Sequence, residues 1–176
     1  MTLFVNSPTC AILQGIAGMR SAAFLTLLAA PAFAQDADPR HQLAEGNLAC
    51  MSGGGRVDLT AQMLSAANWT RDDSGEEGLI YFYPANGDTT FVYMGSDGSF
   101  CHVESTSIDS ATASEILATT LAPPEGAPFE YSKNEMGCTM LDFDTGVTAT
   151  ITSGGNDPTC GSKTDSGVRF QFAANQ

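Results

Sequence analysis

The clearest pattern in the chain is a series of three short apolar runs separated by turn residues. The runs cover residues 79–83, 89–94 and 100–104. Asn86-Gly87 lies between the first two runs, and Asp97-Gly98 lies between the second and the third. Such pairs are typical of tight hairpin turns, because both turn positions need a positive φ. The pattern therefore predicts a three-stranded antiparallel meander.

Two segments carry the three-to-four residue spacing of apolar side chains that is typical of an amphipathic helix. In the first segment, the apolar stripe consists of Leu59, Met63, Leu64 and Ala67. Asp58 is suited to cap its start, and Asn68 is suited to the left-handed position that ends a helix. The second segment covers residues 110–121, with Asp109 as its N-cap and Pro123-Pro124 beyond its end.

The second half of the chain contains four further candidate strands. They cover residues 129–133, 138–143, 147–153 and 167–172. A helix followed by strands thus occurs twice, which raises the hypothesis of a diverged helix-plus-strands repeat. Short links between strands favour antiparallel pairing, with the helices on one face of the sheet. We therefore predict an α+β fold in which antiparallel meanders carry two amphipathic helices on one face.

The first 34 residues have the pattern of an export signal. Arg20 precedes the apolar stretch 22–30, and Ala32-Phe33-Ala34 supplies the small residues that a signal peptidase needs. We predict cleavage after Ala34 and a periplasmic or secreted protein. Residues 1–18 carry no charge, which favours translation from Met19. The polar residues 35–46 are expected to form a flexible leader before a single globular domain over 47–176.

The number of cysteines also indicates a periplasmic or secreted protein. Four remain after the proposed cleavage: Cys50, Cys101, Cys138 and Cys160. An even number in an exported chain predicts two disulfides, and four cysteines allow three pairings. We favour Cys50–Cys101 and Cys138–Cys160, because each pair then closes one half of the chain. No two of these cysteines have the close spacing of a structural zinc site, so a metal site is disfavoured. We expect no cofactor.

Charge narrows the choice of partners. The chain has 7 Lys and Arg against 20 Asp and Glu, a formal net charge of -13. This balance argues against nucleic acid and anionic lipid, and no apolar run is long enough to span a membrane. A basic protein or a cationic peptide fits better. Four carboxylates gather at Asp72, Asp73, Glu76 and Glu77 as weak Ca²⁺ candidates, but their spacing is not that of an EF-hand, which favours a solvated acidic loop.

One short segment resembles the active-site signature of aspartic proteases. In residues 141–148, hydrophobic side chains precede Asp144-Thr145-Gly146. The resemblance implies a pair of aspartates that share a proton and activate water. No second aspartate of the same pattern pairs with Asp144, so we favour a hairpin turn at this place. His102, Asp142 and Asp144 are the weak catalytic candidates of a hydrolase alternative.

An aromatic set on the meander is the candidate binding surface. Cys101 and His102 are neighbours on one strand and face opposite sides of the sheet. If Cys101 faces the helices, His102 lies on the other face with Phe100 and with Tyr81, Tyr83, Phe91 and Tyr93. We favour the interpretation that the second half of the chain packs on this face as ordinary core. The alternative is an open binding surface.

These observations favour a binding or interaction protein over an enzyme. The sequence contains no assembled catalytic set, but it predicts an acidic, disulfide-stabilised, exported domain. The alternatives are the hydrolase around His102, Asp142 and Asp144, and an accessory subunit of a cell-envelope complex that uses the aromatic set as its contact. The sequence does not predict an oligomeric state.

Overall fold

A computed structural model describes residues 38–122, 131–143, 145–154 and 159–173. The predicted signal peptide, its cleavage after Ala34 and the start at Met19 lie outside the described residues, as do Pro123-Pro124 and Asp144. None of the helices in the described ranges is both long enough and apolar enough to cross a bilayer.

In the described part of the chain, eight strands form one antiparallel sheet in the order β1-β2-β3-β4-β8-β7-β6-β5. The strands are β1 (Trp69–Asp72), β2 (Leu79–Pro84), β3 (Thr90–Gly95), β4 (Phe100–Ser105), β5 (Tyr131–Lys133), β6 (Thr139–Phe143), β7 (Val147–Thr152) and β8 (Ser166–Phe172). The predicted meander is confirmed as β2, β3 and β4, and the four later candidates are confirmed as β5 to β8. The sheet thus consists of two four-stranded meanders.

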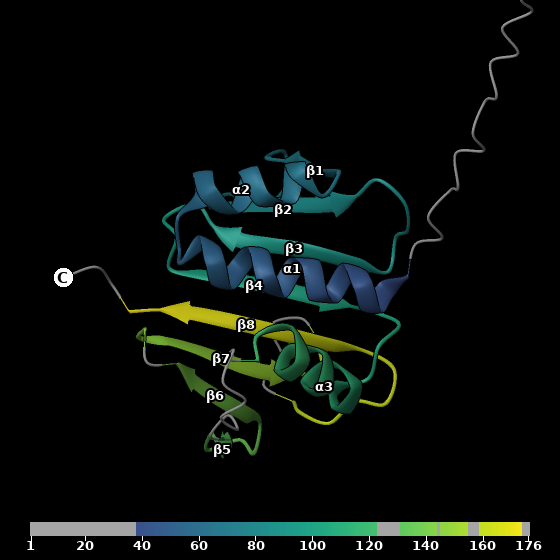
Figure 1. Cartoon of the computed structure of the whole chain (residues 1–176), viewed down its shortest axis with the longest axis vertical. Coiled ribbons are helices and arrows are strands. Elements are labelled where there is room, and N and C mark those ends of the chain that lie inside the picture. Colours follow the sequence, from purple (N-terminus) through teal and green to yellow (C-terminus); the bar gives the residue numbers. More distant parts are fainter. Residues whose placement is uncertain (1–37, 123–130, 144, 155–158, 174–176) are drawn as a thin grey trace, which may run out of the picture. The chain divides into compact units, whose positions relative to one another are not determined.

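Three described helices lie on one face of this sheet (Figure 1). They are α1 (Pro39–Gly53), α2 (Val57–Ala66) and α3 (Ser110–Thr120). Helix α1 packs across β3 and β4 and contacts both other helices, while α3 packs on β7 and β8. The α+β class is confirmed, with one helix more than the two that the apolar stripes predicted.

The additional helix, α1, begins inside the segment that we expected to be a flexible leader, so that expectation is wrong from residue 38 onward. Asp38 caps the helix by accepting a hydrogen bond from the backbone N–H of Arg40 at 3.0 Å, and Pro39 occupies the first turn. Proline is favourable there because its missing N–H would have no helical partner. The buried side of α1 includes polar Gln42 and Asn47, which hides the apolar stripe in the sequence.

Strand β1 is a second element that the sequence concealed. We expected Asp72 to lie with Asp73, Glu76 and Glu77 in a solvated acidic loop, but Asp72 pairs with Tyr81 of β2. Its neighbour Arg71 pairs with Phe82 of the same strand. The strand lies at the edge of the sheet, where charged side chains are common because only one side of the strand is paired. The loop therefore begins at Asp73.

The predicted helix ends are largely confirmed. Asn68 has a φ of 70°, the left-handed conformation expected after α2. Asp109 caps α3 by accepting hydrogen bonds from the backbone N–H groups of Ala111 and Thr112. The predicted cap of α2 is wrong: Arg56 occupies the N-cap, and Asp58 lies in the first turn and pairs with Arg56 at 2.9 Å. A carboxylate in the first turn still favours the helix through its dipole.

The two meanders join through β4 and β8. Six residues of β4 pair with six of β8, from Phe100 opposite Gln171 to Ser105 opposite Ser166. The second half of the chain therefore extends the sheet sideways and does not pack on the aromatic set of the first half. Our favoured interpretation of that set as covered core is wrong. In each half of the chain, helical structure is followed by a four-stranded meander. This order of elements is the one that the repeat hypothesis requires.

Both predicted disulfides are present. Cys50–Cys101 ties α1 to β4, and Cys138–Cys160 ties the start of β6 to the segment before β8. Cys50, Cys101 and Cys138 are fully buried, while Cys160 is partly exposed. The first disulfide lies within the hydrophobic core between α1 and the sheet, so it fixes the helix-covered face.

The difference in burial predicts the order in which the disulfides are reduced. Under native conditions, a small thiol reaches Cys160 directly, whereas Cys50–Cys101 needs the core to open. We expect Cys138–Cys160 to be reduced at least about tenfold faster. Alkylation after timed exposure to dithiothreitol, followed by peptide mass measurement, gives both rates. Equal rates would contradict the buried position of Cys50–Cys101.

Candidate functional site

The sheet face opposite the helices carries a cluster of six rings. Cys101 joins α1 through its disulfide, so its neighbours on β4 point to the other face. We call this cluster the aromatic face; it consists of Tyr81, Tyr83, Phe91, Tyr93, Phe100 and His102. Tyr81 pairs with Tyr93 across β2 and β3, and Tyr93 pairs with His102 across β3 and β4. Antiparallel pairing therefore places rings from three strands side by side.

Four of these rings form a two-by-two array. The centroids of Tyr81 and Tyr93 are 5.6 Å apart, and those of Tyr83 and Phe91 are 6.2 Å apart. Along β2, the rings of Tyr81 and Tyr83 are stacked and nearly parallel, with an angle of 6° between their planes. Phe100 meets Tyr93 edge-on at 6.0 Å. The four rings therefore pack against one another as one continuous array.

Exposure of the array increases toward the edge of the sheet. Tyr93 is buried, Tyr81 and Phe91 are half-buried, and Tyr83 is 42% exposed. None of the described helices packs on this face (Figure 1). The loop after β1 approaches one ring, since a Cβ on Gly75 would lie 2.9 Å from Tyr81. Burial, and then the charge of Glu76, raises the pKa of Tyr81.

His102 is the most buried member of the aromatic face, at 1% exposure. Its ring stacks on Tyr93 with centroids 4.7 Å apart, and its Nδ1 shares a 3.0 Å hydrogen bond with the Tyr93 hydroxyl. Burial, and then the charge of Arg169, lowers the pKa of His102 to about 3. Burial, and then the charge of Glu104, raises the pKa of Tyr93 to about 12. Both side chains are therefore neutral over the ordinary pH range.

Gly167 on β8 is required for this position of His102. A Cβ on Gly167 would overlap the Nε2 of His102, so only glycine leaves room for the ring. The Nε2 atom is buried and has no hydrogen-bond partner among the described residues. The imidazole thus serves as a packed ring with one polar contact.

The structure does not bring the catalytic candidates together. Asp142 lies on β6, three strands from His102 on β4, which is roughly 14 Å at the usual strand spacing. Its carboxylate accepts a hydrogen bond from the Thr148 hydroxyl at 2.9 Å. Asp144 lies outside the described residues.

The four acidic candidates for Ca²⁺ are dispersed over the end of β1 and the loop behind it. Asp72 accepts hydrogen bonds from the backbone N–H and the hydroxyl of Ser74, and these bonds lower its pKa. Asp73 pairs with Arg71 at 2.7 Å. Glu76 and Glu77 are exposed on the loop. Within the described ranges, no three side chains of the metal-ligating types gather in one place.

One residue that contacts the surface, Arg169, was not part of the predicted aromatic set. Phe100 belongs to the ring cluster, and the guanidinium of Arg169 lies 4.2 Å from the centroid of its ring. Arg169 is on β8, opposite His102, so the contact depends on the pairing of β4 with β8. That pairing joins segments more than sixty positions apart and leaves no local signal in the sequence. The contact shows that this face accommodates a cation over an aromatic ring.

No family model matches the chain, and neither a curated protein nor a solved structure matches it. The functional argument therefore depends on the geometry of the chain itself.

The buried imidazole predicts a specific loss of stability in acid. In the unfolded chain His102 takes up a proton near pH 6.5, but in the folded protein it does so only near pH 3. The unfolded state is therefore favoured as the pH falls through this window, by up to about 1.4 kcal/mol per pH unit. His102→Gln should flatten this part of the profile of unfolding free energy against pH.

Urea unfolding at pH 7 and at pH 4.5 measures the effect. His41→Gln is the matched control, because the side chain of His41 is 66% exposed. We expect the His102→Gln variant to lose less stability than the wild type between the two pH values, and the His41→Gln variant to behave as the wild type. Identical losses in all three proteins would show that His102 titrates normally.

Proposed function

We propose that the protein is an exported binding domain whose aromatic face receives a cationic protein or peptide. The observation that carries the proposal is the array of four rings, of which Tyr83 is exposed and Tyr81 and Phe91 are half-buried, with carboxylates around it. Glu104 is opposite Phe91 on the same face, and Asp72 is opposite Tyr81. The charge of Glu76 also acts on Tyr81. Lysine and arginine side chains bind favourably over such rings, and adjacent carboxylates add to the attraction.

The free energy of a single cation–ring contact is small, so binding on this face depends on several weak contacts and not on one deep site. A cation over a tyrosine or phenylalanine ring contributes about 0.5–2 kcal/mol, depending on how far it loses water. Three contacts near the upper value sum to about 6 kcal/mol, a dissociation constant of tens of micromolar, and fewer or weaker contacts give millimolar or weaker binding, typical of transient recognition. The net charge of -13 steers a cationic partner toward the domain at low salt.

The place of action is part of the proposal. Two disulfides are compatible with an oxidising compartment, and the apolar segment 22–30 with Ala32-Phe33-Ala34 supplies the export signal. In the periplasm or outside the cell, the partner is a basic envelope protein or a secreted cationic peptide. No observation favours the hydrolase alternative, since His102 and Asp142 lie on separate parts of the sheet.

Replacement of an exposed ring tests the surface. The probe is octa-arginine, and the variant is Tyr83→Ala, which removes the most exposed member of the array. We expect about a fivefold loss of affinity, from the loss of one cation–ring contact. Calorimetric titration at low and at high salt measures the binding.

Tyr131→Ala is the matched control. Tyr131 is 50% exposed, but it lies on β5 and pairs with the core residue Leu141, so it faces the side of the helices. Its loss should leave the affinity unchanged, while added salt should weaken binding for every variant. If Tyr83→Ala and Tyr131→Ala bind octa-arginine equally well, charge alone holds the peptide and the aromatic face is not the site.

A further inference from the structure

The outer edge of β1 carries backbone groups that no described residue of the chain uses. β1 stands first in the order of strands, so only one of its sides is paired within the described sheet. Just before the strand, the backbone N–H of Ala85 donates to the carbonyl of Asn68 at 3.1 Å, which makes these two residues a hydrogen-bonded pair. Such pairs alternate with unbonded ones along antiparallel strands. The N–H and C=O groups of Trp69 and Arg71 therefore point away from β2.

Hydrogen bonds on the other side of β2 give the same alternation. The N–H of Ser96 donates to the carbonyl of Gly78 at 2.8 Å, so every second residue of β2, counted from Gly78, bonds to β3. The residues between them bond to β1, and they include Tyr83 opposite Thr70. The amide of Thr70 is thus used inside the sheet, whereas the amide of its neighbour Arg71 is available to a partner.

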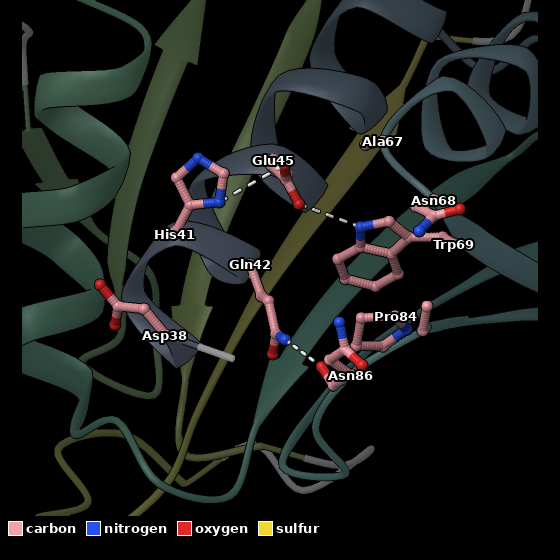
Figure 2. Close-up of a pocket in the computed structure, with 10 residues that line it drawn as sticks. Asp38, His41, Gln42, Glu45, Ala67, Asn68, Trp69, Pro84 and Asn86 are labelled. Carbon is pink, nitrogen blue, oxygen red and sulfur yellow. Dashed lines mark hydrogen bonds and ion pairs between the residues drawn. The ribbon is translucent and has the colours of Figure 1, made fainter. Parts of the chain in front are cut away.

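The helices hold this edge in place before any partner binds. Trp69 is 5% exposed and packs in the core, and α2 packs on β1. Beside a cavity at the start of α1, the indole N–H of Trp69 donates to Glu45 at 3.1 Å (Figure 2). Thr70 and Arg71, in contrast, are exposed. A preformed edge needs little ordering when a partner binds, which favours an added strand.

The charge at this edge selects the kind of partner. Four carboxylates lie at the end of β1 and in the loop behind it: Asp72, Asp73, Glu76 and Glu77. Arg71, the cation of this strand, is paired with Asp73 at 2.7 Å. A second copy of the chain would bring the same carboxylates to the edge and be repelled, whereas a cationic strand is attracted. Strand β5, at the opposite edge, carries Lys133 and belongs to the other meander, away from the rings.

The same edge gives access to the most exposed ring of the array. In an added strand, the residue beside Thr70 points to the aromatic face, because side chains in one row of a sheet share a face. Tyr83 is opposite Thr70, so its position is about 10 Å from that residue, two strand spacings away. An arginine or lysine side chain spans most of this distance, and Thr70 between them is small. The loop residue Gly75 is close to Tyr81, so the route to the array runs over Thr70.

We propose that the cationic peptide binds as an added strand along β1. Its backbone exchanges hydrogen bonds with Arg71, and an arginine or lysine side chain reaches over Thr70 to Tyr83. The carboxylates at the edge attract the cationic side chains, while the main-chain bonds favour an extended segment. This inference rests on the proposed function, because it says how the same partner reaches the aromatic face.

Exchange of the Arg71 amide hydrogen reports on the added strand. The wild-type protein is studied by NMR without and with octa-arginine, and the decay of each amide signal in D2O is timed. With about nine-tenths of the protein bound, exchange at Arg71 should slow by about tenfold, since only the unbound fraction leaves this amide open to solvent. The amides of Thr70 and Asp72 donate within the sheet and are the internal references, so their exchange should change much less.

Removal of the backbone donor gives an independent measurement. Arg71→Pro removes the N–H, and Arg71→Ala is the matched control, because both lose the side chain and only the first loses the donor. Proline is tolerated at an outward-facing position of an edge strand. In calorimetric titration, octa-arginine should bind about fivefold more weakly to Arg71→Pro than to Arg71→Ala.

The outcomes separate this inference from the proposed function. If octa-arginine binds with dependence on Tyr83 but exchange at Arg71 does not change, the added strand is overturned and the proposed function stands. If octa-arginine does not bind, both are overturned. Protection of Arg71 that rises with protein concentration in the absence of peptide identifies a second copy of this chain on the edge and also overturns the proposal. The exchange measurement uses the wild type, so it remains decisive even if Arg71→Pro does not fold.

Discussion

The antiparallel pairing of β4 with β8 is the constraint on which the rest of the structure depends. Each meander alone would have four strands and a helix-covered face, and the pairing of six residues on each strand joins them into one sheet. Val103 and Phe170, from the two strands, are fully buried in the same core. The helices of both halves consequently pack side by side on one face, and the opposite face extends without interruption across both meanders.

The two faces of the sheet differ in chemistry because strand residues alternate. On the helix side, β4 contributes Cys101 and Val103 to a dry core that the disulfide to α1 secures. On the other side, the same strand contributes Phe100, His102 and Glu104 to a surface of rings and charges. Buried, neutral His102 completes the packed array of rings on that surface, and its burial lowers the stability of the folded protein in acid. The proposed binding function follows from the side of the sheet that the helices leave open.

Local signals in the sequence predict much of this architecture. The Asn-Gly and Asp-Gly turns, the left-handed Asn68 and the cap at Asp109 are local, and the structure confirms their elements. The apolar stripe does not reveal α1, because Gln42 and Asn47 are buried within it. Strand propensity does not reveal β1 either, because its Arg71 and Asp72 are charged residues that are typical of an edge strand. The sequence does not predict which distant strands pair. The alternation of Cys101 and His102 predicts the two faces of the sheet, but the partner strand that brings Arg169 onto Phe100 is remote in the sequence.

Access of solvent to the tyrosine rings tests the central claim, an aromatic face left open by a continuous sheet. A neutral gadolinium chelate broadens the ring resonances of exposed side chains in an NMR spectrum, and Tyr131 serves as an exposed reference. The structure predicts strong broadening for Tyr83, intermediate broadening for Tyr81 and little for Tyr93. Protection of Tyr83 and Tyr81 to the level of Tyr93, in the isolated protein, would show that this face is covered and would contradict the account.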